Sequence, residues 1–337
     1  MFSSKHNKNI VYYPPMVDMS YQGAGVDIDL EEETIEAIKS KIGKCTGIIQ
    51  AEGKKLVLCI DGIGSKILIA NAMMKWDTIG IDCMAMNVND ALCLGAKPLA
   101  FVDYLAMETI NPDIARSIAI GLQKGADMAG VSIIGGETAT LPDIVTGLDL
   151  AGTCLGIIIK DLPRDIYPGD YIIGLRSSGI HSNGYTLVRK VLEKEGISYT
   201  DPFPGGGTVG EVLLAPTQIY VKEILDLMQH VDVKGLSHIT GGGLRNLKRL
   251  SKNVCFSIDY PFEPQKIFQV IQRLGNVTPH DMYQTFNMGM GFAIIVSRNT
   301  SDSALDILQK HSTIQAQIVG KVIEGHGVSL PSKDLHY

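Results

Sequence analysis

The sequence K-L-V-L-C-I-D-G-I-G-S-K at residues 55–66 joins an apolar run to an aspartate, two glycines, a hydroxyl group and a lysine. The apolar run 56–60 predicts a β-strand that ends at Asp61. A carboxylate binds hard cations, glycines allow backbone N–H groups to approach an anion, and an ammonium group neutralises negative charge. The segment therefore predicts either a site for a metal-bound phosphate or an ordinary turn at a strand end. Its spacing is not that of a Walker A loop.

A second carboxylate follows in N-V-N-D at residues 87–90, which we expect to lie on a helix. Asn87 and Asp90 are three positions apart, so both side chains can project from one face of such a helix. Asp90 is therefore a candidate partner for Asp61 at the predicted metal site.

The composition limits the class of protein. At 337 residues the chain is longer than one hydrophobic core usually supports, so we expect two domains. Hydrophobic residues make up 45% and charged residues 20%, as is typical of a compact soluble protein. The net charge is −6 and no basic stripe is evident, which argues against nucleic acid as a partner.

The cysteines and the N-terminus predict the compartment. The six cysteines are scattered without metal-ligand spacing, and we expect buried thiols in a reducing cytoplasm. Residues 1–20 lack the apolar core of a signal peptide, and no apolar run is long enough to span a membrane. We therefore expect a cytoplasmic protein without a membrane partner.

The first half predicts strands with acidic side chains. The alternation at residues 26–29 predicts a strand with Asp27 and Asp29 on one face, either as ligands or as a solvated edge. A short buried strand at 131–134 is expected to lead into Glu137, which would repeat the arrangement of the first aspartate. Other expected elements are a helix at 30–42, a turn at 95–98, a strand at 99–107 and a helix from residue 112.

The polar, proline-bearing segment 160–170 predicts a domain boundary, which divides the chain into 1–165 and 166–337. Two loops of the second half follow predicted strands: S-S-G-I-H-S-N-G at 177–184 and H-I-T-G-G-G at 238–243. A loop of small residues before a helix can bind an anion, because unpaired N–H groups point at it. Ordinary helix caps and a structural histidine explain the same residues.

Together these clusters predict an α+β protein of two α/β domains with ATP-dependent activation chemistry in the cleft between them. Several carboxylates with a lysine indicate Mg²⁺ that carries a polyphosphate. The two loops of the second half suit a second, phosphorylated substrate.

The sequence also resembles the aminoimidazole ribonucleotide (AIR) synthetases, the phosphoribosylformylglycinamidine cyclo-ligases of purine biosynthesis, over nearly the whole chain. The motifs that carry the resemblance include A-G-V-D-I-D at 24–29, D-G-I-G-S-K at 61–66, D-T-I-G-I-D at 77–82, N-V-N-D at 87–90, G-G-E-T-A at 135–139, S-S-G-I-H-S-N-G-Y at 177–185, L-L-A-P-T-Q-I-Y at 213–220 and H-I-T-G-G-G at 238–243. The resemblance implies an N-terminal ATP-binding-type domain, a C-terminal domain of the same superfamily and a homodimer joined through the first domains. It also implies ATP-dependent ring closure of formylglycinamidine ribonucleotide.

The resemblance implies roles for particular residues. Those expected at Mg²⁺ are Asp61, Asp90 and Glu137. Those expected at the nucleotide or the ribonucleotide are Asp27, Asp29, Gly62, Gly64, Ser65, Lys66, Asn89, Glu137, Ser182, Asn183, Gly241 and Gly242. Lys66 is expected to meet the transferred phosphate, and either His181 or His238 to move a proton during closure.

Some features depart from the family pattern. The segment Gly43 to Lys54 lacks the usual Gly/Phe-rich loop, Ser65 replaces a threonine, and Thr140 stands where a glutamate is usual. Alternative functions are another ATP-using enzyme of the same superfamily and a non-catalytic nucleotide-binding subunit. The retained carboxylates and lysine argue against the second alternative, because a scaffold does not need buried like charges.

Overall fold

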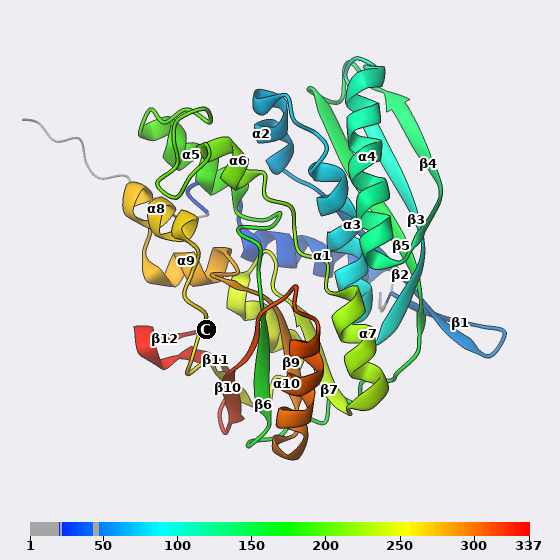
Figure 1. Cartoon of the computed structure of the whole chain (residues 1–337), viewed down its shortest axis with the longest axis vertical. Helices are drawn as coiled ribbons and strands as arrows, with labels where there is room; N and C mark the ends of the chain where they lie inside the picture. Colours follow the sequence, from blue (N-terminus) through cyan, green and yellow to red (C-terminus); the bar gives the residue numbers. More distant parts are fainter. Residues whose placement is uncertain (1–19, 21, 43–46) are drawn as a thin grey trace, which may run out of the picture.

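The computed structural model describes residues 20, 22–42 and 47–337. Residues 1–19 and residues 43–46 lie outside the described part of the chain. What the sequence predicts about them stays a prediction. Two β-sheets organise the described chain: one uses strands between residues 48 and 158, and the other uses strands between 171 and 336 (Figure 1). No described helix is long and apolar enough to cross a membrane, and the five described cysteines are all free.

The first sheet has the order β1-β2-β5-β3-β4. Its strands are β1 (Ile48–Ala51), β2 (Lys54–Gly62), β3 (Ala96–Met107), β4 (Ser132–Thr140) and β5 (Leu148–Ile158). Only β3 and β4 pair in parallel within it. Helices α3 (Ile79–Leu92) and α4 (Pro112–Ala129) lie on one face of this sheet (Figure 1). The two helices pack closely at Gly80, which has no side chain. A Cβ atom there would lie only 2.4 Å from the backbone of α4.

The second sheet has the order β12-β11-β8-β10-β6-β9-β7. Its strands are β6 (Tyr171–Arg176), β7 (Val233–His238), β8 (Cys255–Ser257), β9 (Met290–Val296), β10 (Ala316–Ile323), β11 (Gly327–Leu330) and β12 (Leu335–His336). The remaining helices are α1 (Ile28–Ile42), α2 (Lys66–Met73), α5 (Tyr185–Lys194), α6 (Val209–Leu213), α7 (Val221–His230), α8 (Lys266–Gly275), α9 (Pro279–Thr285) and α10 (Ser301–Lys310), with short 3₁₀ turns at Gly243–Arg249, Arg298–Thr300 and Pro331–Lys333.

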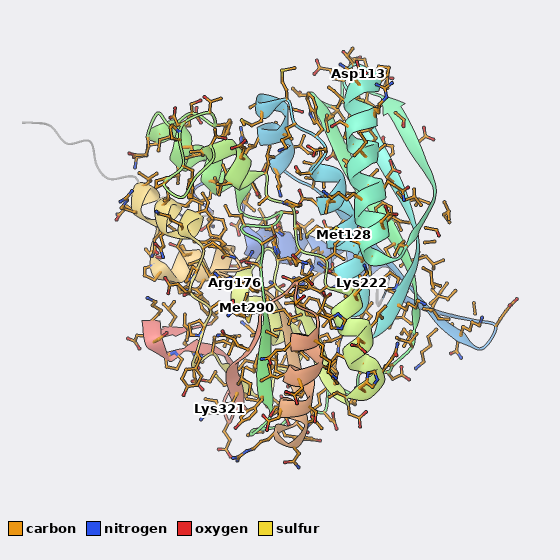
Figure 2. The ribbon with its side chains drawn as sticks, viewed as in Figure 1. Asp113, Met128, Arg176, Lys222, Met290 and Lys321 are labelled. Atoms are coloured by element: carbon orange, nitrogen blue, oxygen red, sulfur yellow. The ribbon has the colours of Figure 1, made fainter. Side chains whose placement is uncertain are left out.

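The ends of two central strands place the loops of the second half near the middle of the molecule. Figure 2 shows Arg176 and Met290 side by side, where β6 ends and β9 begins. The S-S-G-I-H-S-N-G loop starts directly after Arg176 and contacts helices of the first half, since Lys66 of α2 donates to the backbone oxygen of His181.

Three local expectations are wrong. Asp27 and Asp29 are not on a strand: α1 begins at Ile28, and Asp27 caps it by accepting the backbone N–H groups of Asp29 and Leu30 at 3.1 Å. The strand expected at 131–134 is the nine-residue β4, whose side chains are mostly exposed because it is an edge strand. The turn expected at 95–98 largely belongs to β3, which begins at Ala96.

Candidate active site

Two carboxylates meet where β2 ends against α3. Asp61 lies at the end of β2, and its backbone oxygen accepts a hydrogen bond from the Asn87 side chain of α3 at 3.2 Å. Burial raises the pKa of Asp61 to about 6, and the nearby Asp90 carboxylate contributes to the rise. Two like charges in a partly buried place favour a bound cation, and carboxylate oxygens are the ligands that Mg²⁺ prefers.

Asp90 also contacts the second half of the chain. Its Oδ1 lies 2.9 Å from Nδ1 of His238, at the end of β7. Both residues line a cavity of about 440 Å³, and Arg164 and Arg249 line it as well. We call this cavity the cleft. Because its walls come from both halves of the chain, Asp90 joins the carboxylate site to a histidine from the other sheet.

His181 lies in a different environment. It is buried, and its Nε2 accepts the backbone N–H groups of Ser178 at 3.2 Å and Gln218 at 3.5 Å. These bonds place the proton of the neutral ring on Nδ1. Burial, with smaller contributions from His238 and Lys66, lowers the pKa of His181 well below its usual value. The ring is therefore neutral and enclosed, whereas His238 lines the cleft.

Lys66 does not point into an open phosphate site. Its ammonium is fully buried and lies within 2.9 Å of both carboxylate oxygens of Asp82. It also donates to the backbone oxygens of His181 at 3.1 Å and Ala215 at 2.7 Å. The lysine therefore links the start of α2 to two loops of the second half, a position that the sequence did not reveal.

Asp82 gathers further bonds from the second half. It accepts hydrogen bonds from the backbone N–H of Thr217 at 2.7 Å and from its hydroxyl at 2.6 Å. The Ser182 hydroxyl is 3.4 Å away. Sequence analysis did not single out Asp82 or Thr217, although both lie in motifs of the resemblance. Their pairing depends on contacts between residues 135 positions apart.

Glu137 lies on the wrong face of the sheet to join Asp61. Strand register aligns Asp61, Gly152 and Asp103 across three strands, so these residues share the face covered by α3. Glu137 is in register with Tyr104, one position further along, and is exposed on the opposite face. Asp103 is in register with Asp61 through Gly152, and burial raises its pKa. Sequence analysis assigned no role to this residue.

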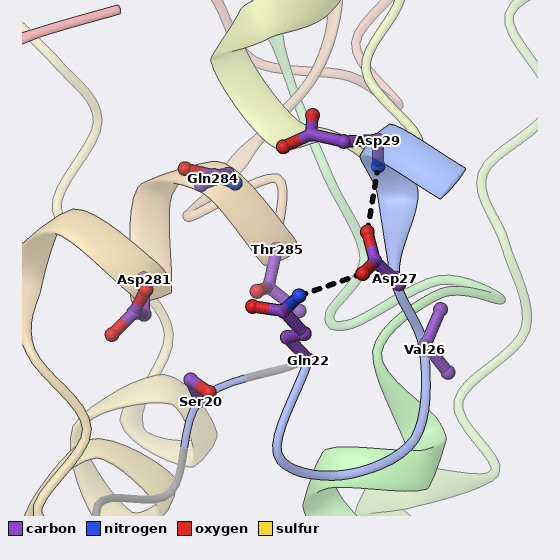
Figure 3. A pocket seen from close by; sticks show the side chains of 8 residues that line it. All are labelled: Ser20, Gln22, Val26, Asp27, Asp29, Asp281, Gln284 and Thr285. Atoms are coloured by element: carbon purple, nitrogen blue, oxygen red, sulfur yellow. Dashed lines mark hydrogen bonds between the residues drawn. The ribbon is translucent and has the colours of Figure 1, made fainter. Parts of the chain in front are cut away.

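Asp27 and Asp29 also lie away from the cleft. They line a separate, small cavity of about 100 Å³ against α9, together with Asp281 and Thr285 (Figure 3). The Gln22 amide donates to Asp27 at 2.6 Å, and this bond and the cap of α1 lower the pKa of Asp27. Both aspartates thus have structural partners, since Asp29 pairs with Arg245 at 3.1 Å.

Two other predicted binding residues already have protein partners. The Asn89 side chain is buried, donates to the Gln218 backbone oxygen at 2.9 Å and accepts the Tyr220 N–H at 3.1 Å. The Ser65 hydroxyl lies 3.0 Å from that of Thr186. Gly62 and Gly64 flank the turn into α2, and Gly64 needs its positive φ of 65° there.

The two glycine-containing loops of the second half lie close to each other. A Cβ atom at Gly241 would lie 2.9 Å from Oδ1 of Asn183. Asn183 follows Ser182 directly, and Gly242 has a positive φ of 95°. In the described part of the chain, no group of three or more His, Cys, Asp or Glu residues is placed to hold a metal ion.

Comparisons with known proteins agree with this architecture. The family model of the AIR synthase related protein, N-terminal domain, matches residues 43–158, and that of the C-terminal domain matches residues 167–333. A phosphoribosylformylglycinamidine cyclo-ligase of Methanococcus maripaludis strain C7 is 46% identical over 333 residues, covering 94% of this chain and 95% of the relative. One from Methanocaldococcus jannaschii is 46% identical over 325 residues, covering 91% and 93%.

Solved structures show the same fold at low identity. A thiamine monophosphate kinase from Aquifex aeolicus has a TM-score of 0.65 at 18% identity and covers 91% of this chain and 99% of its own. The hydrogenase maturation protein HypE in complex with ATP has a TM-score of 0.60 at 18% identity and covers 84% and 83%. The predicted fold class of two α/β domains is therefore confirmed, while the boundary at residue 165 stays a prediction.

Proposed function

The chain belongs to the phosphoribosylformylglycinamidine cyclo-ligase family of AIR synthase related proteins, and on this premise we propose that its cleft closes the imidazole ring of formylglycinamidine ribonucleotide with cleavage of ATP. The observation that carries the proposal is the position of Asp90. Its carboxylate contacts His238 from the second sheet and lies close enough to Asp61 to raise the pKa of that residue. Asp90 thus brings a histidine that lines the cleft, a candidate for proton transfer, next to the carboxylate pair for a charged cosubstrate.

The chemistry needs activation and alignment. The formyl oxygen of the substrate is a poor leaving group. Transfer of the γ-phosphoryl group of ATP to this oxygen allows the neighbouring amine to attack the formyl carbon, and the oxygen then leaves as phosphate. His238 is the better candidate for the proton on that amine, because it lines the cleft with its Nδ1 2.9 Å from Asp90, whereas its Nε2 lies 3.4 Å from the buried Asn89 amide. His181, neutral and enclosed, serves to shape the loop that begins at Ser177.

Asp61 and Asp90 would hold Mg²⁺, since the mostly buried Asp61 carboxylate lies near the negative charge of the half-exposed Asp90, and such a pair suits a cation. The ion would neutralise charge on the phosphates of ATP. Lys66 acts as a positioning residue in this scheme, because its buried pair with Asp82 holds the His181–Ser182 loop against α3. Glu137 is exposed on the other face of the sheet and has no role at this carboxylate pair within one chain.

We further propose a cytoplasmic homodimer joined through the first sheet. In Figure 1, α3 and α4 cover one face of this sheet, and the opposite face carries apolar side chains that the described chain leaves exposed. Ile60 is 76% exposed and Leu58 50% exposed, and Tyr104 lies on the same face. An apolar sheet face of this kind is costly in water and is typical of a subunit interface.

The decisive experiment is turnover by the purified protein. Incubation with formylglycinamidine ribonucleotide, ATP and Mg²⁺ should yield ADP, phosphate and aminoimidazole ribonucleotide in equal amounts. Formation of ADP only with a different phosphate acceptor would instead indicate another enzyme of the superfamily. Nucleotide binding without ADP release would indicate a non-catalytic subunit.

A further inference from the structure

A second cavity lies beside the cleft and is strongly basic. It has a volume of about 300 Å³ and is lined by Gly241, Gly242, Arg245, Asn246, Lys248, Arg249 and Lys252. We call this cavity the basic groove. Four of its seven lining residues are cations and none is acidic, although the protein as a whole has a net charge of −6. An anionic ligand is the natural counterpart of such a concentration of charge.

Most of these cations are available to a ligand. Lys248, Arg249 and Lys252 are exposed, and no hydrogen bond or ion pair with another described residue engages their charged groups. Arg245 is already engaged, since it pairs with Asp29 at 3.1 Å. Like charges held near one another repel, and a bound anion removes that repulsion.

The glycine loop supports the same ligand class. The buried Asn246 amide donates to the backbone oxygens of Gly241 at 3.2 Å and Gly243 at 2.8 Å. These carbonyl oxygens are therefore already paired, which reduces the number of acceptors that would repel an anion.

We propose that the basic groove binds the 5′-phosphate monoester of the ribonucleotide substrate. Arg249 lines both the groove and the cleft, so a ligand whose phosphate lies among the cations extends toward His238 and Asp90. A phosphate monoester carries nearly two negative charges at neutral pH and matches several cations at once. The phosphates of ATP belong at the carboxylate pair of the other domain. This inference rests on the proposed function for the identity of the substrate.

The kinetic test uses Lys248→Gln and Arg249→Gln, with Lys321→Gln as the matched control. Lys321, labelled in Figure 2, is exposed on β10 and lines neither the groove nor the cleft. Each groove variant should raise KM for the ribonucleotide about tenfold or more, since a charge-assisted hydrogen bond is lost, and leave KM for ATP within about twofold of wild type. The control should behave as wild type. An increase in KM for ATP instead, or unchanged constants, would overturn the proposal.

A binding test does not depend on turnover. Inorganic phosphate should raise the melting temperature of the wild type more than chloride at equal ionic strength, and Lys248→Gln/Lys252→Gln should abolish this difference. An equal response of the double variant would overturn the groove as a phosphate site. If the groove passes this test while the wild type makes no aminoimidazole ribonucleotide, the proposed function fails and the phosphate site stands.

Discussion

The ammonium group of Lys66 lies 2.8 Å from the Asp82 carboxylate, and neither side chain is exposed to solvent. Burial lowers the pKa of Lys66, while Asp82 opposes that shift. The pair joins α2 and α3 of the first half to the loops at His181 and Ala215 of the second half. A buried pair of this kind contributes little net stability but strongly disfavours arrangements that separate its partners. It therefore fixes how the two halves of the cleft face each other.

Breaking this pair should destabilise the protein. Lys66→Met leaves the Asp82 carboxylate buried without its counter-charge, and the free energy of unfolding should fall by about 3–5 kcal/mol. The double variant Lys66→Met/Asp82→Leu removes both charges and should recover part of the loss. Urea denaturation measures both effects. A single variant as stable as wild type would show that the pair does not link the two halves.

Asp61→Asn should lower turnover by orders of magnitude while the protein remains folded. The amide keeps the size of the side chain but supplies no negative charge for Mg²⁺. Initial rates over a range of Mg²⁺ concentrations test this, with Asp113→Asn at the exposed start of α4 as the control (Figure 2). Wild-type rates at saturating Mg²⁺ would refute the assignment of Asp61 as a ligand.

His238→Gln should lower kcat by about 10²- to 10⁴-fold, the usual range for loss of a general acid or base. KM values should change little, because the imidazole acts on the reacting amine and not on the phosphates. Steady-state kinetics with saturating ATP distinguish the two parameters. If kcat were unchanged, the proton would have to leave by another route.

His181 should make the protein sensitive to acid. Because its pKa is below the ordinary value of 6.5 in the folded state, the unfolded chain takes up a proton first as the pH falls. The contribution of the neutral ring to the free energy of unfolding is fully present above pH 6.5. Below that pH it falls by about 1.4 kcal/mol per pH unit. His181→Asn tolerates the positive φ of 67° and should flatten this dependence, as measured by urea unfolding between pH 7 and about pH 5. Parallel profiles for the two proteins would contradict the assignment.

Ile60→Asp should dissociate the proposed homodimer. It places a charge in the centre of the exposed apolar face of the first sheet, where desolvation on association would be costly. Sedimentation velocity should show a dimer for the wild type and a monomer for the variant. A monomeric wild type would remove the basis of this proposal.

Much of the local structure was predictable from the sequence. The apolar run 56–60 predicted β2, and the spacing of Asn87 and Asp90 predicted one face of α3. These signals are local, because a strand has a period of two and a helix a period near four. The basic groove was also present in the sequence as R-N-L-K-R-L-S-K at 245–252, but nothing marked its cations as neighbours of one cavity.

The sequence alone determined that Asp61 and the two loops of the second half follow strands, because local periodicity fixes each element. Only the tertiary structure decided which of them meet. The register of β2, β5 and β3 aligned Asp61 with Asp103 and turned Glu137 to the opposite face, and the packing of the two halves paired Lys66 with Asp82. A shift of one residue in a strand reverses its faces, and such registers depend on contacts between segments distant in the chain.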